Sequence, residues 1–292
     1  MTEGQFKEIV PQNGQAIEAL NQDPTTSQMA QERLEEGCAA YSNKKYDEAI
    51  ECFKKAIKLN PNPAKTYYNL GITYAEGKKD YIRAIKCYEK ALELDSNLIV
   101  VYHNLGIAYA KGKKDYDKAI ECLNNSIELN PNSASAYCVL GIVYAEGKKD
   151  YDGAIEYLSR AIELDPNFAV AYSDLGLVYA KGKKDYDKAI DYYNKAIELD
   201  PNFAEAYNGL GLVHVEQKKD YGKAIEYYNK AIELSPNFAA AYRNLGRVCL
   251  ISGRQKKAKE YFEKGSKLGD KHSRQMLRYR SIWGYGETRK QP

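Results

Sequence analysis

The chain has 292 residues, of which 44% are hydrophobic and 28% charged, and its formal net charge is +3. With only 3 His and 3 Met, it offers little material for catalysis or metal binding, both of which rely heavily on histidine. No apolar run approaches the ~18 residues that a membrane span requires, and the polar segment 1–30 lacks the apolar stretch of a secretory signal peptide. We therefore expect a cytoplasmic protein without a membrane span.

Residues 1–29 come before any internal repetition and differ in composition from the rest of the chain. They contain Pro11 and Pro24 and are rich in Gln, Asn and Thr, a composition that buries little apolar surface. They predict a flexible leader, with a short helix around residues 14–20.

The main feature of the chain is a repeat. The dipeptide Leu-Gly recurs six times at a constant spacing of 35 residues, and its Gly residues are Gly71, Gly106, Gly141, Gly176, Gly211 and Gly246. Gly37 lies 34 residues before the first of them and begins a divergent copy. The repetition predicts seven units, at residues 30–63, 64–98, 99–133, 134–168, 169–203, 204–238 and 239–272.

Each unit contains the pattern of two amphipathic helices. In the unit 169–203, the apolar residues Tyr172, Leu175 and Tyr179 lie at helical spacing on one face. Ala189, Tyr193 and Ala196 mark one face of the second helix. In the five middle units a Lys-Lys pair lies between the two helices, and the Asp that follows it is placed to cap the second helix; these residues are Asp80, Asp115, Asp150, Asp185 and Asp220. The small Gly and Ala residues let the two helices of a unit approach closely.

The order of Leu-Gly, Tyr, Ala, aromatic, Ala and Pro resembles the tetratricopeptide repeat, over residues 30–272. The resemblance implies an all-α fold, a right-handed α-solenoid of seven helix-turn-helix repeats. The five middle units have 35 residues instead of the usual 34, because 13 residues separate Gly71 from Ala84 but only 12 separate Gly37 from Ala49. We expect the additional residue in the turn between the helices, which makes that turn similar to the longer turns of Sel-type repeats.

The last segment, residues 273–292, is predicted to hold a capping helix and a basic tail. A solenoid needs a final helix with a polar outer face to cover the apolar side of its last repeat. We expect a helix over residues 270–282, with Met276, Leu277 and Ile282 facing inward, and a frayed end from Trp283 onward.

No constellation of residues indicates catalysis. The three His residues lie far apart, and no phosphate-binding Gly-rich loop is present. Cys52, Cys87 and Cys122 occupy one position in three successive units, too far apart for a disulfide or a shared metal ion. We expect no enzyme, no cofactor and no metal site.

In the tetratricopeptide family the first helices line a concave face, where an extended peptide or a helix of a partner protein commonly lies. Asn at the position two residues before the Gly matches the family residue that hydrogen-bonds a ligand backbone, and an aliphatic residue follows the Gly. The candidate groove residues are Tyr68, Asn69, Ile72, His103, Asn104, Ile107, Ile142, Leu177, Asn208, Arg243, Asn244 and Arg247. In the alternative interpretation, the Asn residues cap local polar groups and the aliphatic row is core. Leu34 and Cys38 replace the Lys and Asn of a carboxylate clamp for chaperone tails, so that clamp is not expected.

The predicted function is therefore that of a protein–protein interaction scaffold or adaptor whose partner the sequence does not name. An alternative function is the binding of nucleic acid or another anionic surface. It is less favoured because an Asp follows each Lys-Lys pair of the turns and no aromatic interleaving for base stacking is evident there. Residues 254–292 carry 12 Lys and Arg against 4 Asp and Glu. The Lys-Lys pairs in the turns form a second basic feature, made of Lys78, Lys79, Lys113, Lys114, Lys148, Lys149, Lys183, Lys184, Lys218 and Lys219. The sequence leaves the oligomeric state open.

Overall fold

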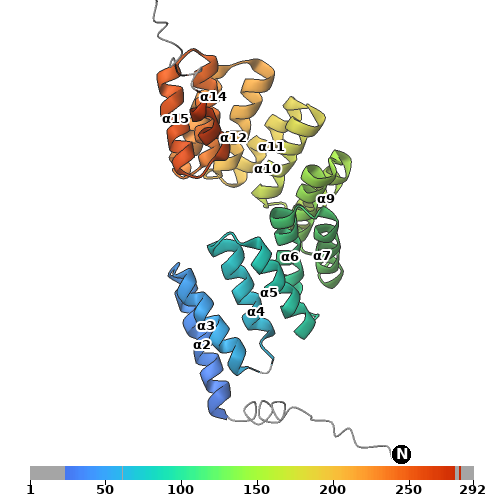
Figure 1. The fold of residues 1–292 in the computed structure, drawn as a ribbon. Helices are drawn as coiled ribbons and strands as arrows, with labels where there is room; N and C mark the ends of the chain where they lie inside the picture. Colours follow the sequence, from blue (N-terminus) through green and yellow to red (C-terminus); the bar gives the residue numbers. More distant parts are fainter. Residues whose placement is uncertain (1–23, 61, 280–282, 284–292) are drawn as a thin grey trace, which may run out of the picture. The chain divides into compact units, whose positions relative to one another are not determined.

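The structure is a computed structural model that describes residues 24–60, 62–279 and 283. Throughout these residues the secondary structure is helical and no strand forms, as Figure 1 shows. The prediction of an all-α solenoid is confirmed. The chain divides into two compact units, residues 1–131 and 132–292, which are described separately below.

The first unit is built from three successive helix pairs. Each first helix packs against its own partner, and each second helix packs against the first helix of the next pair. Short π-helices, labelled η, extend the first helices of the later pairs. The elements are α2 (Pro24–Ser42), α3 (Tyr46–Leu59), α4 (Ala64–Ile72), η1 (Thr73–Gly77), α5 (Tyr81–Leu94), α6 (Ile99–Ala108), η2 (Tyr109–Lys113) and α7 (Tyr116–Leu129).

The second unit repeats the same pairing four times and adds a final short helix. Its elements are α8 (Ala134–Val143), η3 (Tyr144–Lys148), α9 (Tyr151–Leu164), α10 (Ala169–Val178), η4 (Tyr179–Lys183), α11 (Tyr186–Leu199), α12 (Ala204–Val213), η5 (His214–Lys218), α13 (Tyr221–Leu234), α14 (Ala239–Ile251), α15 (Gln255–Lys267) and α16 (Lys271–Arg278).

The helices of a pair approach closely because a glycine on the first helix faces a large side chain on the second. Ala189 and Ala196 on α11 are completely buried, and Tyr193 between them is 2% exposed. A Cβ added to Gly176 on α10 would lie only 2.8 Å from the Tyr193 ring. The predicted Gly and Ala packing is present, and the side chain that fills the space beside the glycine is the aromatic residue of the second helix.

The additional residue of the 35-residue units does not lie in the turn, where the sequence analysis placed it. It lies in the five-residue π-helix that ends the first helix of each middle pair. In such a pair the N–H of Asp185 donates to the carbonyl of Tyr179, six residues earlier, at 3.1 Å. In the last pair, which has no extra residue, the N–H of Arg254 donates to the carbonyl of Cys249, five residues earlier, at 2.8 Å. One inserted residue widens the last helical turn and leaves the rest of the pair unchanged.

The turn that follows has the same backbone conformation in every pair. In the five middle helix pairs, the second lysine of the Lys-Lys turn has a left-handed backbone, with φ between 51° and 58° from Lys79 to Lys219. In the first helix pair, Lys44 has φ 59°. The next Asp then caps the second helix as predicted; Asp185, for example, accepts a hydrogen bond from the N–H of Lys188. The last pair places Gly253 at the left-handed position, with φ 70°.

The two ends differ from the expected boundaries. Helix α2 begins at Pro24, so residues 24–29 are helical and not part of a flexible leader, whereas the helix expected around 14–20 lies outside the described residues. Helix α16 ends at Arg278, and Ile282 is not described. Trp283, expected in a frayed tail, instead packs edge-on against Phe262 and donates its indole N–H to the carbonyl of Met276 at 3.0 Å. An aromatic side chain gains this contact because it covers the end of the apolar cluster.

Candidate binding groove

The predicted groove residues fall into two sets, because the chain divides between α7 and α8. Those of the first unit lie on α4 and α6, and all are half-buried. They are Tyr68, Asn69, Ile72, His103, Asn104 and Ile107. Those of the second unit lie on α8, α10, α12 and α14; they are Ile142, Leu177, Asn208, Arg243, Asn244 and Arg247.

In the first unit the predicted asparagines donate to the preceding repeat. The amide N–H of Asn104 donates to the hydroxyl of Tyr68 at 3.2 Å, and that of Asn69 donates to the Sγ of Cys38 at 3.6 Å. Burial lowers the pKa of His103, which keeps its imidazole neutral at pH 7. Each Asn amide retains a second N–H and oxygen lone pairs for a ligand.

In the second unit the same two repeat positions are joined across neighbouring helices. Asn244 on α14 donates to Oδ1 of Asn208 on α12 at 2.9 Å. Two helix pairs earlier, the thiol of Cys138 on α8 donates to Asp174 on α10 at 3.4 Å. These contacts link residues 36 apart, so the two positions join successive first helices. The alternative interpretation, in which the Asn side chains hydrogen-bond local polar groups, therefore describes part of their role.

A cavity of about 360 Å³ lies on the face shared by α10, α12 and α14. Five of the predicted residues line it, namely Leu177, Asn208, Arg243, Asn244 and Arg247. Ile142 is not among its lining residues. We call this cavity the groove. In it, three successive first helices bring their predicted residues into one cavity.

At one point of the groove the repeat's usual side chain is missing. Gly209 on α12 stands at the position occupied by Asn in three other repeats. A Cβ at Gly209 would lie 2.3 Å from Cζ of Tyr193, so the glycine leaves room for that ring, which lines the groove. Within the described part of the chain, the buried hydroxyl of Tyr193 has no hydrogen-bond partner. Burial raises the pKa of Tyr193, so the hydroxyl keeps its proton.

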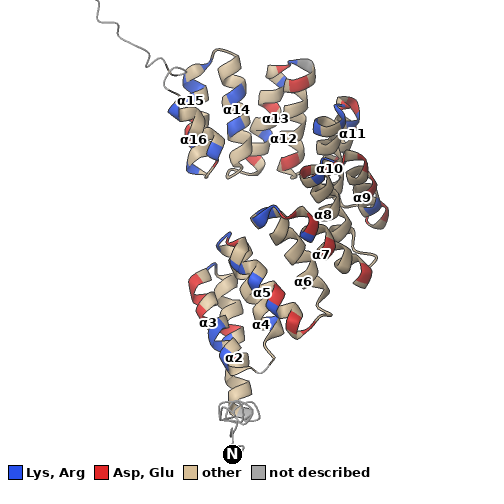
Figure 2. Cartoon of the chain, turned by 45° about the vertical axis from the view of Figure 1, so that its right-hand side comes forward, with Lys and Arg blue, Asp and Glu red and all other residues tan. Residues whose placement is uncertain are grey.

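Charge is unevenly distributed along the groove. Its acidic residues, Asp174 and Glu205, come from α10 and α12, and Lys181 comes from η4. Its arginines, Arg243 and Arg247, come from α14. Figure 2 marks the basic residues on α14. Burial, together with the nearby charges of Glu146 and Glu205, raises the pKa of Asp174 to about 6. Sequence reasoning did not select Asp174, Glu205, Tyr193 or Gly209, although Asp174 and Gly209 occupy the same repeat position as the selected asparagines.

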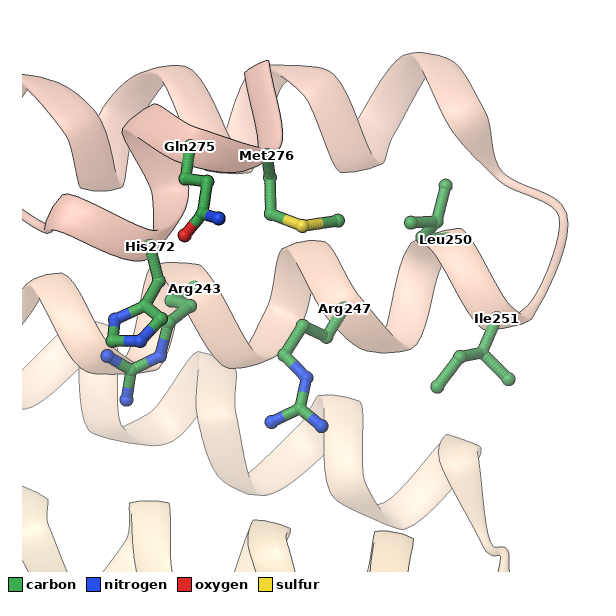
Figure 3. Close-up of a pocket in the computed structure, with 7 residues that line it drawn as sticks. All are labelled: Arg243, Arg247, Leu250, Ile251, His272, Gln275 and Met276. Carbon is green, nitrogen blue, oxygen red and sulfur yellow. The ribbon is translucent and has the colours of Figure 1, made fainter. Parts of the chain in front are cut away.

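A second cavity, of about 490 Å³, lies between α14 and α16 (Figure 3). Arg243, Arg247, Leu250 and Ile251 contribute from α14, and His272, Gln275 and Met276 contribute from α16. Arg243 and Arg247 also line the groove, so the two cavities are neighbours. We call this second cavity the cap pocket.

The Lys-Lys turns are partly neutralised. Lys78 forms an ion pair with Asp47 at 2.7 Å, and Lys183 forms one with Asp152. In both cases the aspartate belongs to the second helix of the preceding pair. The first lysine of a turn can therefore be used in joining neighbouring repeats.

The described residues offer little for other chemistry. No three of their His, Cys, Asp or Glu side chains gather into a group that could hold a metal ion. All six cysteines are free thiols, and burial raises the pKa of each of them. None of the helices in the described part is long and apolar enough to cross a bilayer.

Comparisons with known proteins identify the repeat. A TPR repeat model matches residues 37–76 and 183–218, and a tetratricopeptide repeat model matches residues 62–129, 97–167 and 202–270. No curated protein matches the sequence significantly.

Solved structures give the same picture. The crystal structure of MamA protein is 32% identical with a TM-score of 0.52, and the match covers 61% of this chain and 94% of that one. A tetratricopeptide repeat protein from Parabacteroides merdae ATCC 43184 is 20% identical with a TM-score of 0.73, covering 86% of this chain and 98% of that one. Yeast Tom70 is 22% identical with a TM-score of 0.64, and covers 90% of this chain and 55% of its own. The chain belongs to the tetratricopeptide repeat family, and its fold is that of a protein–protein interaction scaffold.

Proposed function

We propose that the groove lined by α10, α12 and α14 binds an extended or helical segment of a partner protein, and that the chain acts as a non-catalytic adaptor. The observation that carries this proposal is the convergence of side chains from three successive first helices on one cavity of about 360 Å³. That volume falls in the range of ligand-binding cavities, about 300–1,000 Å³.

The groove combines the groups that a peptide requires. Leu177 and Leu212 supply half-buried apolar surface, and Asn208 supplies an amide that can pair with a peptide backbone. The unpaired hydroxyl of Tyr193 can donate to a ligand carbonyl. Each such hydrogen bond contributes about 0.5–1.5 kcal/mol, which is consistent with micromolar affinity, about −8 kcal/mol in total.

The first unit carries a parallel set of candidates, and we assign them the same role. Asn69 and Asn104 retain free hydrogen-bonding capacity beside half-buried Ile72 and Ile107. A cytoplasmic location is part of the proposal, because six free thiols are typical of a reducing compartment.

The test is to block the groove without disturbing the core. Ala240 lines the groove and is half-buried, so Ala240→Arg places a long side chain in it. Asn229→Arg on α13 makes the same charge change at an exposed position that does not line the groove. Partner peptides selected on the native chain are expected to lose binding to Ala240→Arg and to keep it with Asn229→Arg. Equal binding to both variants, each with native helicity by circular dichroism, would refute the groove assignment.

The alternative, an anionic surface bound through the Lys-Lys turns and the basic tail, draws less support. Lys78 and Lys183 are already paired with aspartates, which lowers the net charge available to phosphates. Retention of the chain by nucleic acid or anionic vesicles at low salt, lost steeply as salt rises, would favour this alternative.

A further inference from the structure

The cap pocket differs from the groove in the charge of its walls. Among the described residues, its lining contains Arg243, Arg247, His272 and Gln275 and no carboxylate. In the view of Figure 3, the side chain of Arg243 lies beside His272, and the side chain of Arg247 extends from α14 on the side away from Gln275 and Met276. Every polar group in this set can donate a hydrogen bond, so the pocket is built for a group that accepts them.

The two arginines are in different states. Arg243 forms an ion pair with Asp270 at 2.8 Å, and Asp270 also caps α16 by accepting from the N–H of Ser273. Arg243 is thus held in place and its charge is compensated. Arg247 is exposed and makes no ion pair with any described residue. Arg247 is therefore the group whose charge is available to a ligand.

The rest of the pocket is apolar. Leu250 and Met276 are half-buried, and Ile251 is 56% exposed, the highest value among the large hydrophobic residues of the described chain. In the part of the chain that the structure describes, no Tyr, Phe or Trp lines the pocket, so these residues form no platform for stacking nucleic-acid bases. Because the lining combines basic and apolar side chains, an anionic group with an aliphatic or aromatic group next to it fits the pocket better than inorganic phosphate.

We propose that the cap pocket receives an acidic side chain of the partner segment together with a large apolar side chain next to it. Arg247 holds the carboxylate, and Leu250, Ile251 and Met276 cover the apolar side chain. The proposal rests on the proposed function, because Arg243 and Arg247 line both cavities and one segment can occupy both.

The charges of the groove give that segment a direction. Asp174 and Glu205 lie on α10 and α12, and Lys181 lies on η4 after α10, so this end of the groove carries both signs of charge, unlike the cap pocket on α14 and α16. The partner segment therefore lies with its acidic and apolar residues over α16 and with neutral residues, or residues of both charges, over α10 and α12. Electrostatic complementarity of this kind fixes register and excludes segments of the opposite polarity.

The test uses a phage library of random short peptides selected on the full chain. We expect the selected peptides to pair Asp or Glu with a nearby Leu, Ile, Met or Phe. Loss of a charge-assisted hydrogen bond predicts binding weaker by about 10- to 100-fold in Arg247→Glu. Ile251→Ser should weaken it by about 10-fold through lost apolar contact. The matched control is Arg274→Glu, an exposed residue of α16 outside the pocket, which should bind as the native chain does.

The outcomes separate the two proposals. Peptides that require the groove, and so fail with Ala240→Arg, yet bind Arg247→Glu as well as the native chain overturn the cap-pocket proposal and leave the proposed function intact. Selection of no peptide at all refutes the proposed function and the cap pocket with it. Binding of a fluorescent single-stranded RNA that is lost in Arg247→Glu and kept in Arg274→Glu would replace the protein segment by a nucleic acid.

Discussion

Gly209→Ala tests the packing that creates the groove. The ring of Tyr193 lies between Gly176 on α10 and Gly209 on α12. A Cβ at Gly209 would lie 2.3 Å from Cζ and 2.4 Å from Cε1 of that ring, and a Cβ at Gly176 would lie 2.8 Å from it on the other side. Because Tyr193 is 2% exposed, the ring cannot move away without displacing a helix.

Two effects of opposite sign determine how much Gly209→Ala changes the free energy of unfolding. Overpacking a core by one methyl group costs about 1–3 kcal/mol, and contacts this short place the cost in the upper part of that range. Replacing a helical glycine by alanine returns about 1 kcal/mol through helix propensity. We expect Gly209→Ala to lower the free energy of unfolding by about 1–2 kcal/mol, the difference between these values.

The matched control is the same substitution on the next helix. A Cβ at Gly222 on α13 would meet only Oδ1 of Asp220, at an ordinary 3.4 Å. Gly222→Ala should therefore stabilise the protein by up to about 1 kcal/mol. Urea unfolding followed by circular dichroism measures both variants, and hydrogen exchange of the α10–α12 amides locates the change.

The same substitution in a Tyr193→Leu background tests whether the contact with the Tyr193 ring causes the loss of stability. Repeats with Leu at the Tyr193 position, such as Leu123 and Leu158, occur in this chain. In a Tyr193→Leu background, Gly209→Ala should cost less than in the native chain, because the ring it collides with is gone. If Gly209→Ala is as stabilising as Gly222→Ala, the contact between Gly209 and Tyr193 does not limit the packing and this account of the groove is wrong.

Two further predictions concern the turn and the pH dependence. Lys184 has φ 58°, a conformation that costs a non-glycine residue at least about 1 kcal/mol. Glycine removes that cost but has a larger conformational entropy in the unfolded chain, so Lys184→Gly should raise the free energy of unfolding by up to about 1 kcal/mol. An unchanged Tm would contradict this prediction. Burial raises the pKa of Asp174 to about 6, above the unfolded value of about 3.9. The folded chain therefore favours the protonated carboxyl, and the free energy of unfolding decreases as pH rises from about 4 through 6. Asp174→Asn should therefore be more stable than the native chain at pH 7.5 and equally stable near pH 4 in urea unfolding, and a difference independent of pH would count against it.

Sequence reasoning was sufficient for the parts of the fold that depend on local pattern. The periodicity of Tyr172, Leu175 and Tyr179 predicted a helix at that position, and the Asp after each Lys-Lys pair predicted the cap that Asp185 provides. The location of the inserted residue could not be obtained in the same way. The distance between Gly71 and Ala84 counts residues, and it is the same whether the extra one widens a helix or lengthens a turn.

The groove was less predictable because it depends on contacts between repeats. The resemblance aligned the family's ligand-binding position with Asn104 and Asn244, and in the structure part of each amide is used by a residue 36 positions earlier. Tyr193 was recognised as a core residue and not as a groove residue. Its role in the groove follows only from the missing side chain of Gly209, which lies in another repeat.

Three groove residues differ from the residue that is usual at their position in the repeat. Gly209 and Asp174 replace an Asn, and Arg247 replaces the aliphatic residue that follows the Leu-Gly pair in five other repeats. All three line one cavity in the second unit. The repeated positions build nearly identical helix pairs, each stabilised mainly by its neighbours, so they cannot distinguish one ligand from another. Under the proposed function, specificity comes from these exceptions. A substitution of the exposed Arg247 should change partner choice without changing stability, whereas substitutions of Gly209 and Asp174 should change both.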